Sequence, residues 1–163
     1  MQANGQSSAV ASIPLVATAP QVWQEINPAS ANYGYAVAIN QDGTINSPQH
    51  PAQPGWIETI FVNGAGMLSP QPSDGSRGAK GTEPVAPITV QIGMMSYAMG
   101  DLLYQSPYTC PLKYVGAAPG LAAGVVQVNF QLPSKGLLPG SVLLSLQSGS
   151  QTAFASLWTP PAN

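Results

Sequence analysis

Charged side chains are scarce in this sequence. Only 6% of its 163 residues are Asp, Glu, Lys or Arg, whereas typical soluble domains have about 25%. Four basic and six acidic residues give a net charge of -2, and so few Lys and Arg cannot neutralise a row of phosphates. The composition therefore excludes nucleic acid as an expected partner. Ser, Thr, Gln and Asn must therefore provide most of the polar surface, and weak charge repulsion between molecules favours their association.

Cysteine and histidine each occur once, as Cys110 and His50. A lone Cys excludes an intrachain disulfide, and a zinc site needs several clustered His, Cys or carboxylate ligands. Nucleophilic catalysis needs a base beside Ser or Cys, and the sequence contains no G-x-S-x-G motif. We therefore expect no metal, no cofactor and no conventional catalytic triad.

Long apolar runs are also missing. No run reaches the ~18 residues of a membrane helix, and the start MQANGQSSAV lacks the regions of a signal peptide. Membrane insertion is therefore not expected.

Turn-forming residues are abundant, with 17 Gly and 17 Pro spread along the chain. They interrupt any long helical pattern, whereas VQVNFQL (126–132) alternates between an apolar face and a face of Gln and Asn. Short runs of this kind predict an all-β, immunoglobulin-like β-sandwich of about seven to nine strands. The expected strands are 8–17, 34–39, 56–62, 88–92, 112–115, 125–132, 142–146 and 152–158. The expected core includes Trp56, Ile60, Val128, Phe130, Leu144 and Leu146.

The stretch from 38 to 66 gathers much of the rare chemistry of the chain. NQDG (40–43) is typical of a tight turn, since Asn, Asp and Gly tolerate positive φ, and the acidic ligands that would complete a calcium loop are missing. His50 lies among prolines in SPQHPAQPG, which indicates an exposed linker position rather than a catalytic base.

Two segments are expected to be loops, at 69–84 and 94–111. The second is MMSYAMGDLLYQSPYTCP, which is rich in Tyr and Met. Tyr has a flat apolar ring with a polar tip, and Met adapts its shape. It is interpreted as a lid over the sandwich core, and alternatively as a surface for glycan or protein contacts. The binding candidates are Tyr97, Met99, Tyr104, Tyr108 and Tyr114.

Several pieces of the chain, in this order, resemble one known family. NQDGTINS, IETIFVNGAG, YVGAAPG and QVNFQLP are similar to the immunoglobulin-like C-terminal repeat domains of uncharacterised secreted proteins of Acidobacteria such as Solibacter. IFVNGAG also resembles the IPT/TIG type of immunoglobulin-like fold. The resemblance implies a β-sandwich with an architectural or adhesive role, extracellular or on the cell surface.

The first residues depart from that family pattern. NGQSSAVASIPLVATAP resembles the last strand of a preceding domain, so residues 1–18 are interpreted as an orphan strand and residues 19–163 as the sandwich domain. An unpaired apolar strand tends to find another edge. We therefore expect a homo-oligomer formed through residues 2–17.

Two hypotheses about function follow. The first is a non-catalytic extracellular module that binds a protein or glycan surface, or a second copy of itself. The alternative is a small hydrolase or glycan-active protein that uses Asp101, Glu58 or His50 near the 94–114 segment. Paired carboxylates for glycoside hydrolysis would come from Glu58, Glu83 or Asp101.

Overall fold

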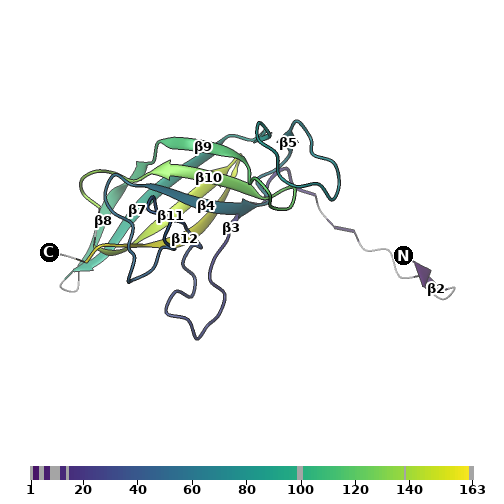
Figure 1. The fold of residues 1–163 in the computed structure, drawn as a ribbon. Helices are drawn as coiled ribbons and strands as arrows, with labels where there is room; N and C mark the ends of the chain where they lie inside the picture. Colours follow the sequence, from purple (N-terminus) through teal and green to yellow (C-terminus); the bar gives the residue numbers. More distant parts are fainter. Residues whose placement is uncertain are drawn as a thin grey trace.

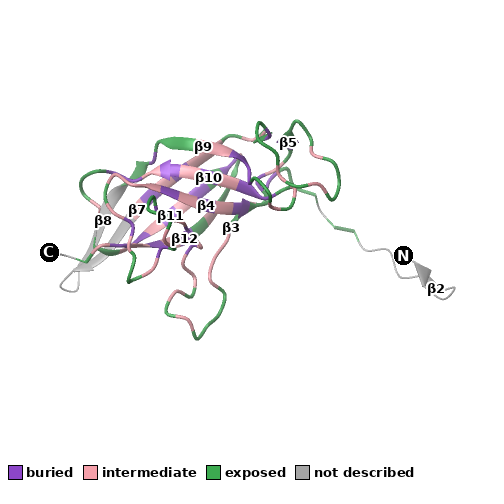
Figure 2. Ribbon diagram, viewed as in Figure 1, coloured by how far each residue is buried: buried purple, intermediate pink, exposed green. Residues whose placement is uncertain are grey.

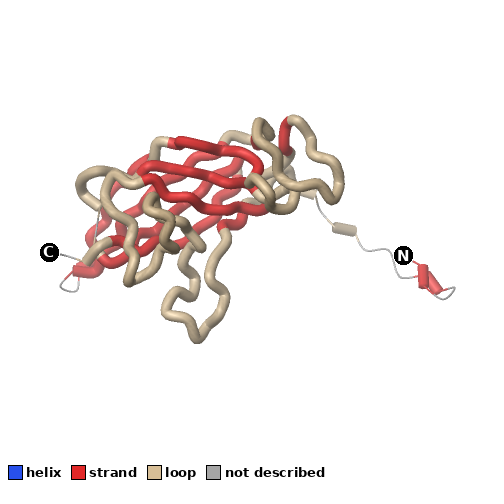
Figure 3. The backbone as a smooth tube through the Cα atoms, in the orientation of Figure 1, coloured by secondary structure: helices blue, strands red, loops and turns tan. Residues whose placement is uncertain are grey.

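A computed structural model describes residues 2–3, 6–7, 12–13, 15–98, 101–137 and 139–161, with the backbone alone for 2–3, 6–7, 94–98 and 101–106. The described chain is built from strands and turns, without a helix (Figures 1 and 3). Among these residues no helix has the length and apolar character to span a membrane. The all-β sandwich expected from the Gly and Pro content is confirmed.

Two four-stranded sheets form the sandwich, with strand orders β3-β4-β10-β9 and β12-β11-β7-β8. All the neighbouring strands in both sheets pair in antiparallel fashion. Two further antiparallel strand pairs, β1-β2 and β5-β6, form separate two-stranded sheets. The strands are β1 Gln2–Ala3, β2 Gln6–Ser7, β3 Gln21–Val22, β4 Ile57–Asn63, β5 Leu68–Ser69, β6 Glu83–Pro84, β7 Ile88–Ala98, β8 Asp101–Thr109, β9 Leu112–Ala117, β10 Val126–Gln131, β11 Gly140–Ser148 and β12 Gln151–Thr159.

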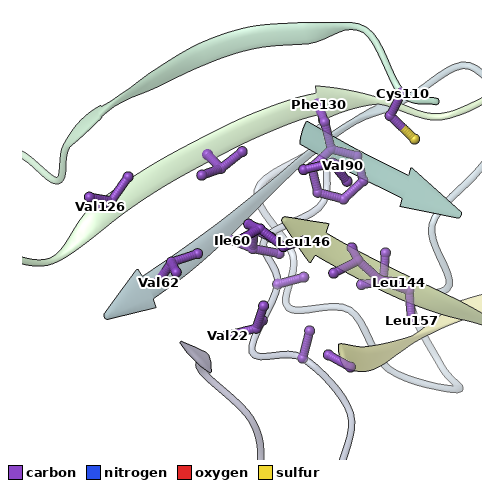
Figure 4. Packing of buried hydrophobic residues seen from close by; sticks show 14 of the residues in the cluster. Val22, Ile60, Val62, Val90, Cys110, Val126, Phe130, Leu144, Leu146 and Leu157 are labelled. Carbon is purple, nitrogen blue, oxygen red and sulfur yellow. The ribbon is translucent and has the colours of Figure 1, made fainter. Parts of the chain in front are cut away.

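The core lies between the two sheets and follows the period-two alternation of their strands. Figure 2 shows buried and partly exposed residues alternating along β4 and β10. Phe130 points from β10 into the space between the sheets (Figure 4). Five of the six expected core residues are buried: Ile60, Val128, Phe130, Leu144 and Leu146.

Trp56 is the expected core residue that is not buried. It precedes β4 and is partly exposed, and its backbone amide bonds the carbonyl of Gln53 in a turn. The inward position at this end of β4 belongs instead to Glu58, which is fully buried. The alternation of β4 predicted correctly which of its faces points into the core, but it did not predict that an acidic residue would lie on that face.

Three of the predicted elements differ from the structure. Most of residues 94–111 are in strands rather than in a loop: 94–98 belong to β7 and 101–109 to β8, because these two strands pair with each other in an antiparallel hairpin. Residues 34–39 make only isolated bridges rather than a strand, because their partners change from one residue to the next. Residues 12–13 and 15–17 are not in a strand, since no neighbouring strand pairs with them.

The NQDG segment is a turn, as predicted. The backbone amide of Gly43 bonds the carbonyl of Asn40, and Gly43 has a φ of 86°. Asn40 and Asn46 are buried and hold the turn in place. The Asn46 side chain bonds both the amide and the carbonyl of Trp158 on β12, at 2.8 and 2.9 Å. Both asparagines therefore have a structural role.

The burial of Phe130 in the core predicts that its truncation strongly reduces stability. Phe130→Ala should lower the free energy of unfolding by roughly 3 to 5 kcal/mol, because a buried aromatic ring is lost and a cavity remains. Urea unfolding followed by tryptophan fluorescence measures this difference. Gln147→Ala, at an exposed position of β11, is the control. Equal stability of the two variants would contradict the assignment of Phe130 to the core.

Candidate functional site

The expected binding residues of the Met- and Tyr-rich segment are divided between the two sheets. Tyr97 and Tyr104 lie on the paired strands β7 and β8, and Tyr108 lies further along β8 with 42% of its surface exposed. Tyr114 belongs to β9 in the opposite sheet, where its hydroxyl donates to the Ala117 carbonyl at 3.0 Å. Met99 lies outside the described residues. Tyr114 therefore does not share a sheet with the other three tyrosines.

The three residues of the catalytic alternative have different environments. Asp101 begins β8 and pairs with Ala98 across the hairpin. His50 is exposed in a turn closed by Ser47, whose backbone exchanges two hydrogen bonds of 3.1 Å with that of His50. Glu58 is closed off from solvent on β4. Glu58 and His50 thus do not share an open site.

Glu58 is the most unusual titratable group of the described chain. It lies opposite Phe130 in the β4–β10 register, and its side chain has no exposed surface. Neither of its carboxyl oxygens has a hydrogen-bond partner among the described residues. A buried polar group without a partner is costly.

Burial raises the pKa of Glu58 to about 8, and the negative charge of nearby Asp42 adds to the effect. The carboxyl group therefore keeps its proton at neutral pH. Asp42 is affected in the opposite direction: hydrogen bonds from the Thr44 side chain and backbone lower its pKa. A protonated carboxyl group that is closed off from solvent and has no hydrogen-bond partner among the described residues affects the stability of the fold.

The raised pKa predicts that stability falls as pH rises from about 4.5 to about 8. The unfolded chain releases the Glu58 proton near pH 4.5 and the folded chain near pH 8, so the folded state binds the extra proton between these values. Its contribution is complete below pH 4.5 and is lost as pH rises through 8, by up to about 1.4 kcal/mol per pH unit. Urea unfolding at several pH values measures the slope.

Glu58→Gln and Glu58→Leu should flatten this slope, and Glu58→Leu should also raise stability at pH 9, because the buried group no longer ionises. Glu83→Gln removes an exposed carboxylate and serves as the matched control. A slope in the Glu58 variants equal to that of the wild type would refute the assignment.

Cys110 is buried beside the core, with 3% of its surface exposed. Burial raises the pKa of its thiol to about 12. Because the thiolate is the reactive form, the geometry indicates an inert packing residue.

We expect Cys110 to react with Ellman's reagent only on unfolding. At pH 8 the folded protein should show little labelling, whereas the protein in guanidinium chloride should be labelled stoichiometrically, because unfolding exposes the thiol. Rapid, complete labelling of the folded chain would contradict this burial.

The loops at one end of the sandwich form two neighbouring hollows. One, of about 290 Å³, is lined by residues 66–68, 71–75 and 123–124 and contains Asp74. The other, of about 570 Å³, contains Arg77. The 69–84 segment packs tightly on the neighbouring loop at Gly78, where a Cβ would come within 2.2 Å of the Ala118 carbonyl oxygen. Among the described residues, no three His, Cys, Asp or Glu residues are grouped so that they could bind a metal ion.

A partly exposed polar surface covers the outer side of the β3-β4-β10-β9 sheet. Its centre is the row that Gln127, Asn129 and Gln131 form on β10, pointing away from the core. We call this surface, with its flanking aromatic residues, the amide face. In the sequence, this row is evident only as the water-facing side of VQVNFQL. Its flanking aromatics were missed, because they come from distant strands. The amide face consists of Trp23, Phe61, Tyr114, Gln127, Asn129 and Gln131.

No protein-family model, no curated protein and no solved structure matches this chain. The likeness to immunoglobulin-like repeat domains therefore stays a prediction, and the interpretation of function depends on the geometry.

Proposed function

We propose that this chain is a non-catalytic structural and interaction module of an extracellular or cell-surface protein. Its low charge and its β-sandwich support this role. The hydrolase alternative lacks such support, because Glu58 is sealed in the core and His50 is exposed in a turn. A module of this kind acts through its surfaces and edges.

The observation that carries the proposal is an exposed apolar segment before β3. Ile13, Leu15 and Val16 are 78%, 97% and 66% exposed. Figure 1 shows this part of the chain leading away from the sandwich. The segment is anchored at Thr18, whose hydroxyl donates to the Ser148 carbonyl at 2.9 Å, and at Ala19, which bonds Gly64.

Burial of these side chains by a second copy would remove their apolar surface from water. An extended segment gains further hydrogen bonds by adding to the edge of a sheet. β8 and β9 are each the end strand of a sheet, and an end strand can accept an added strand. The proposed partner is therefore a second copy of the chain.

A triple variant tests this self-association. Ile13→Ser, Leu15→Ser and Val16→Ser together should convert a concentration-dependent oligomer into a monomer with an unchanged melting temperature, because these side chains lie outside the core. Light scattering coupled to size exclusion measures the mass.

The matched control replaces three exposed apolar residues elsewhere, with Ile26→Ser, Met67→Ser and Val85→Ser. It should leave the oligomer intact. A monomeric wild type, or equal dissociation by both triple variants, would overturn the proposal.

A further inference from the structure

The amide face combines two kinds of side chain in a fixed register. Asn129 lies between Thr59 on β4 and Tyr114 on β9, and Gln127 lies between Phe61 and Gly116. Neighbouring strands are about 4.8 Å apart, so Asn129 and Gln127 each have an aromatic residue on an adjacent strand, whereas Gln131 lies opposite Ile57. The sheet therefore presents amides in the middle and rings on either side.

The amides are ordered but still have free hydrogen-bonding capacity. Gln127 Nε2 donates to Asn129 Oδ1 at 2.9 Å, and Gln131 Nε2 donates to the Gly55 carbonyl at 3.0 Å. Among the described residues, the Asn129 amino group and the Gln127 carbonyl oxygen have no protein partner. The face thus offers a donor and an acceptor whose orientation is already set.

The flanking rings are also held in place. Trp23 and Phe61 pack with their ring centroids 5.5 Å apart. On the other side, the hydrogen bond from Tyr114 to Ala117 draws the tyrosine ring against Gly116, where a Cβ would come within 2.7 Å of the Tyr114 hydroxyl oxygen. Any residue other than glycine would displace this ring.

The charge of the face restricts the ligand. The outward positions of β4 and β10 are Ile57, Thr59, Phe61, Asn63, Gln127, Asn129 and Gln131, and none of them is ionisable. An anionic chain would find no counter-charge on β4 or β10. A purely apolar partner would leave the amides without hydrogen bonds, at a cost in affinity.

We propose that the amide face binds a neutral polysaccharide. The rings of sugars have apolar faces that pack on aromatic side chains, and their hydroxyl groups both donate and accept hydrogen bonds. A sugar on the β10 row would accept from Asn129 Nδ2 and donate to Gln127 Oε1, with Tyr114 or the Trp23–Phe61 pair beside its ring. This assignment rests on the proposed role as a non-catalytic binding module.

Affinity electrophoresis of the full chain tests the assignment, with xylan, amylose, soluble β-glucan and glucomannan as neutral probes and polygalacturonate as the anionic one. We expect at least one neutral gel, and not the anionic gel, to retard the wild type. Asn129→Ala and Gln127→Ala should each weaken binding about tenfold. Tyr114→Phe keeps the ring but removes the hydroxyl that holds it to Ala117, so it should weaken binding less than Asn129→Ala does.

Gln147→Ala, which removes an amide from the outer side of the other sheet, is the matched control and should bind as the wild type does. Melting temperatures identify any variant that fails to fold. Absence of retardation in every neutral gel, or equal binding by Asn129→Ala and the wild type, would overturn the proposal. Dissociation of an oligomer by the amide variants would overturn it in favour of a second copy as the occupant.

The variant with serine at positions 13, 15 and 16 separates the two proposals. It should still bind the polysaccharide, because the amide face does not include that segment. If the wild type self-associates but binds no polysaccharide, only the glycan assignment is refuted. If it binds polysaccharide but remains a monomer, only the self-association is refuted.

Discussion

The antiparallel register between β4 and β10 is the constraint on which both the core and the surface depend. Val128 pairs with Ile60 and points inward, while the next pair, Asn129 with Thr59, points outward. A slip of one residue would place Asn129 in the core and Val128 in water. Core packing therefore holds the amides of β10 in their row, and no separate element is needed to position them.

The shortage of charge has different effects inside and outside the sandwich. Outside, it leaves faces of Gln, Asn, Ser and Thr that carry little electrostatic repulsion between molecules. Such faces are suited to neutral partners, in contrast to the basic surfaces that bind phosphate chains. Inside, Glu58 is the exception, a carboxyl group without a hydrogen-bond partner in the described structure.

Glu58 shows how a fold retains an unfavourable residue. Phe130, opposite it on β10, and Ile60, two residues along β4, are both fully buried, so water is kept away from its surroundings. The carboxyl group remains because it is protonated at neutral pH, which costs less than burial of a charge. The net stability of the sandwich thus includes a cost that grows with pH.

Local sequence determined the class of fold and most of its strands. The Gly and Pro content excluded long helices, NQDG identified a turn, and VQVNFQL identified both faces of β10, because turn chemistry and alternation act between near neighbours. The resemblance to immunoglobulin-like repeats predicted a sandwich as well.

Only the tertiary structure decided which distant residues meet. The pattern of residues 94–111 did not distinguish a lid from the β7–β8 hairpin, since pairing depends on a second strand. Alternation placed both Trp56 and Glu58 on the inner face of β4, but it could not indicate that Glu58 is the buried one and that Trp56 is partly exposed. Tyr114 and Phe61 flank one row of amides because β9 and β4 pair with opposite edges of β10. Strand order arises from contacts distant in sequence, so it follows from the packing of the whole chain rather than from any local pattern.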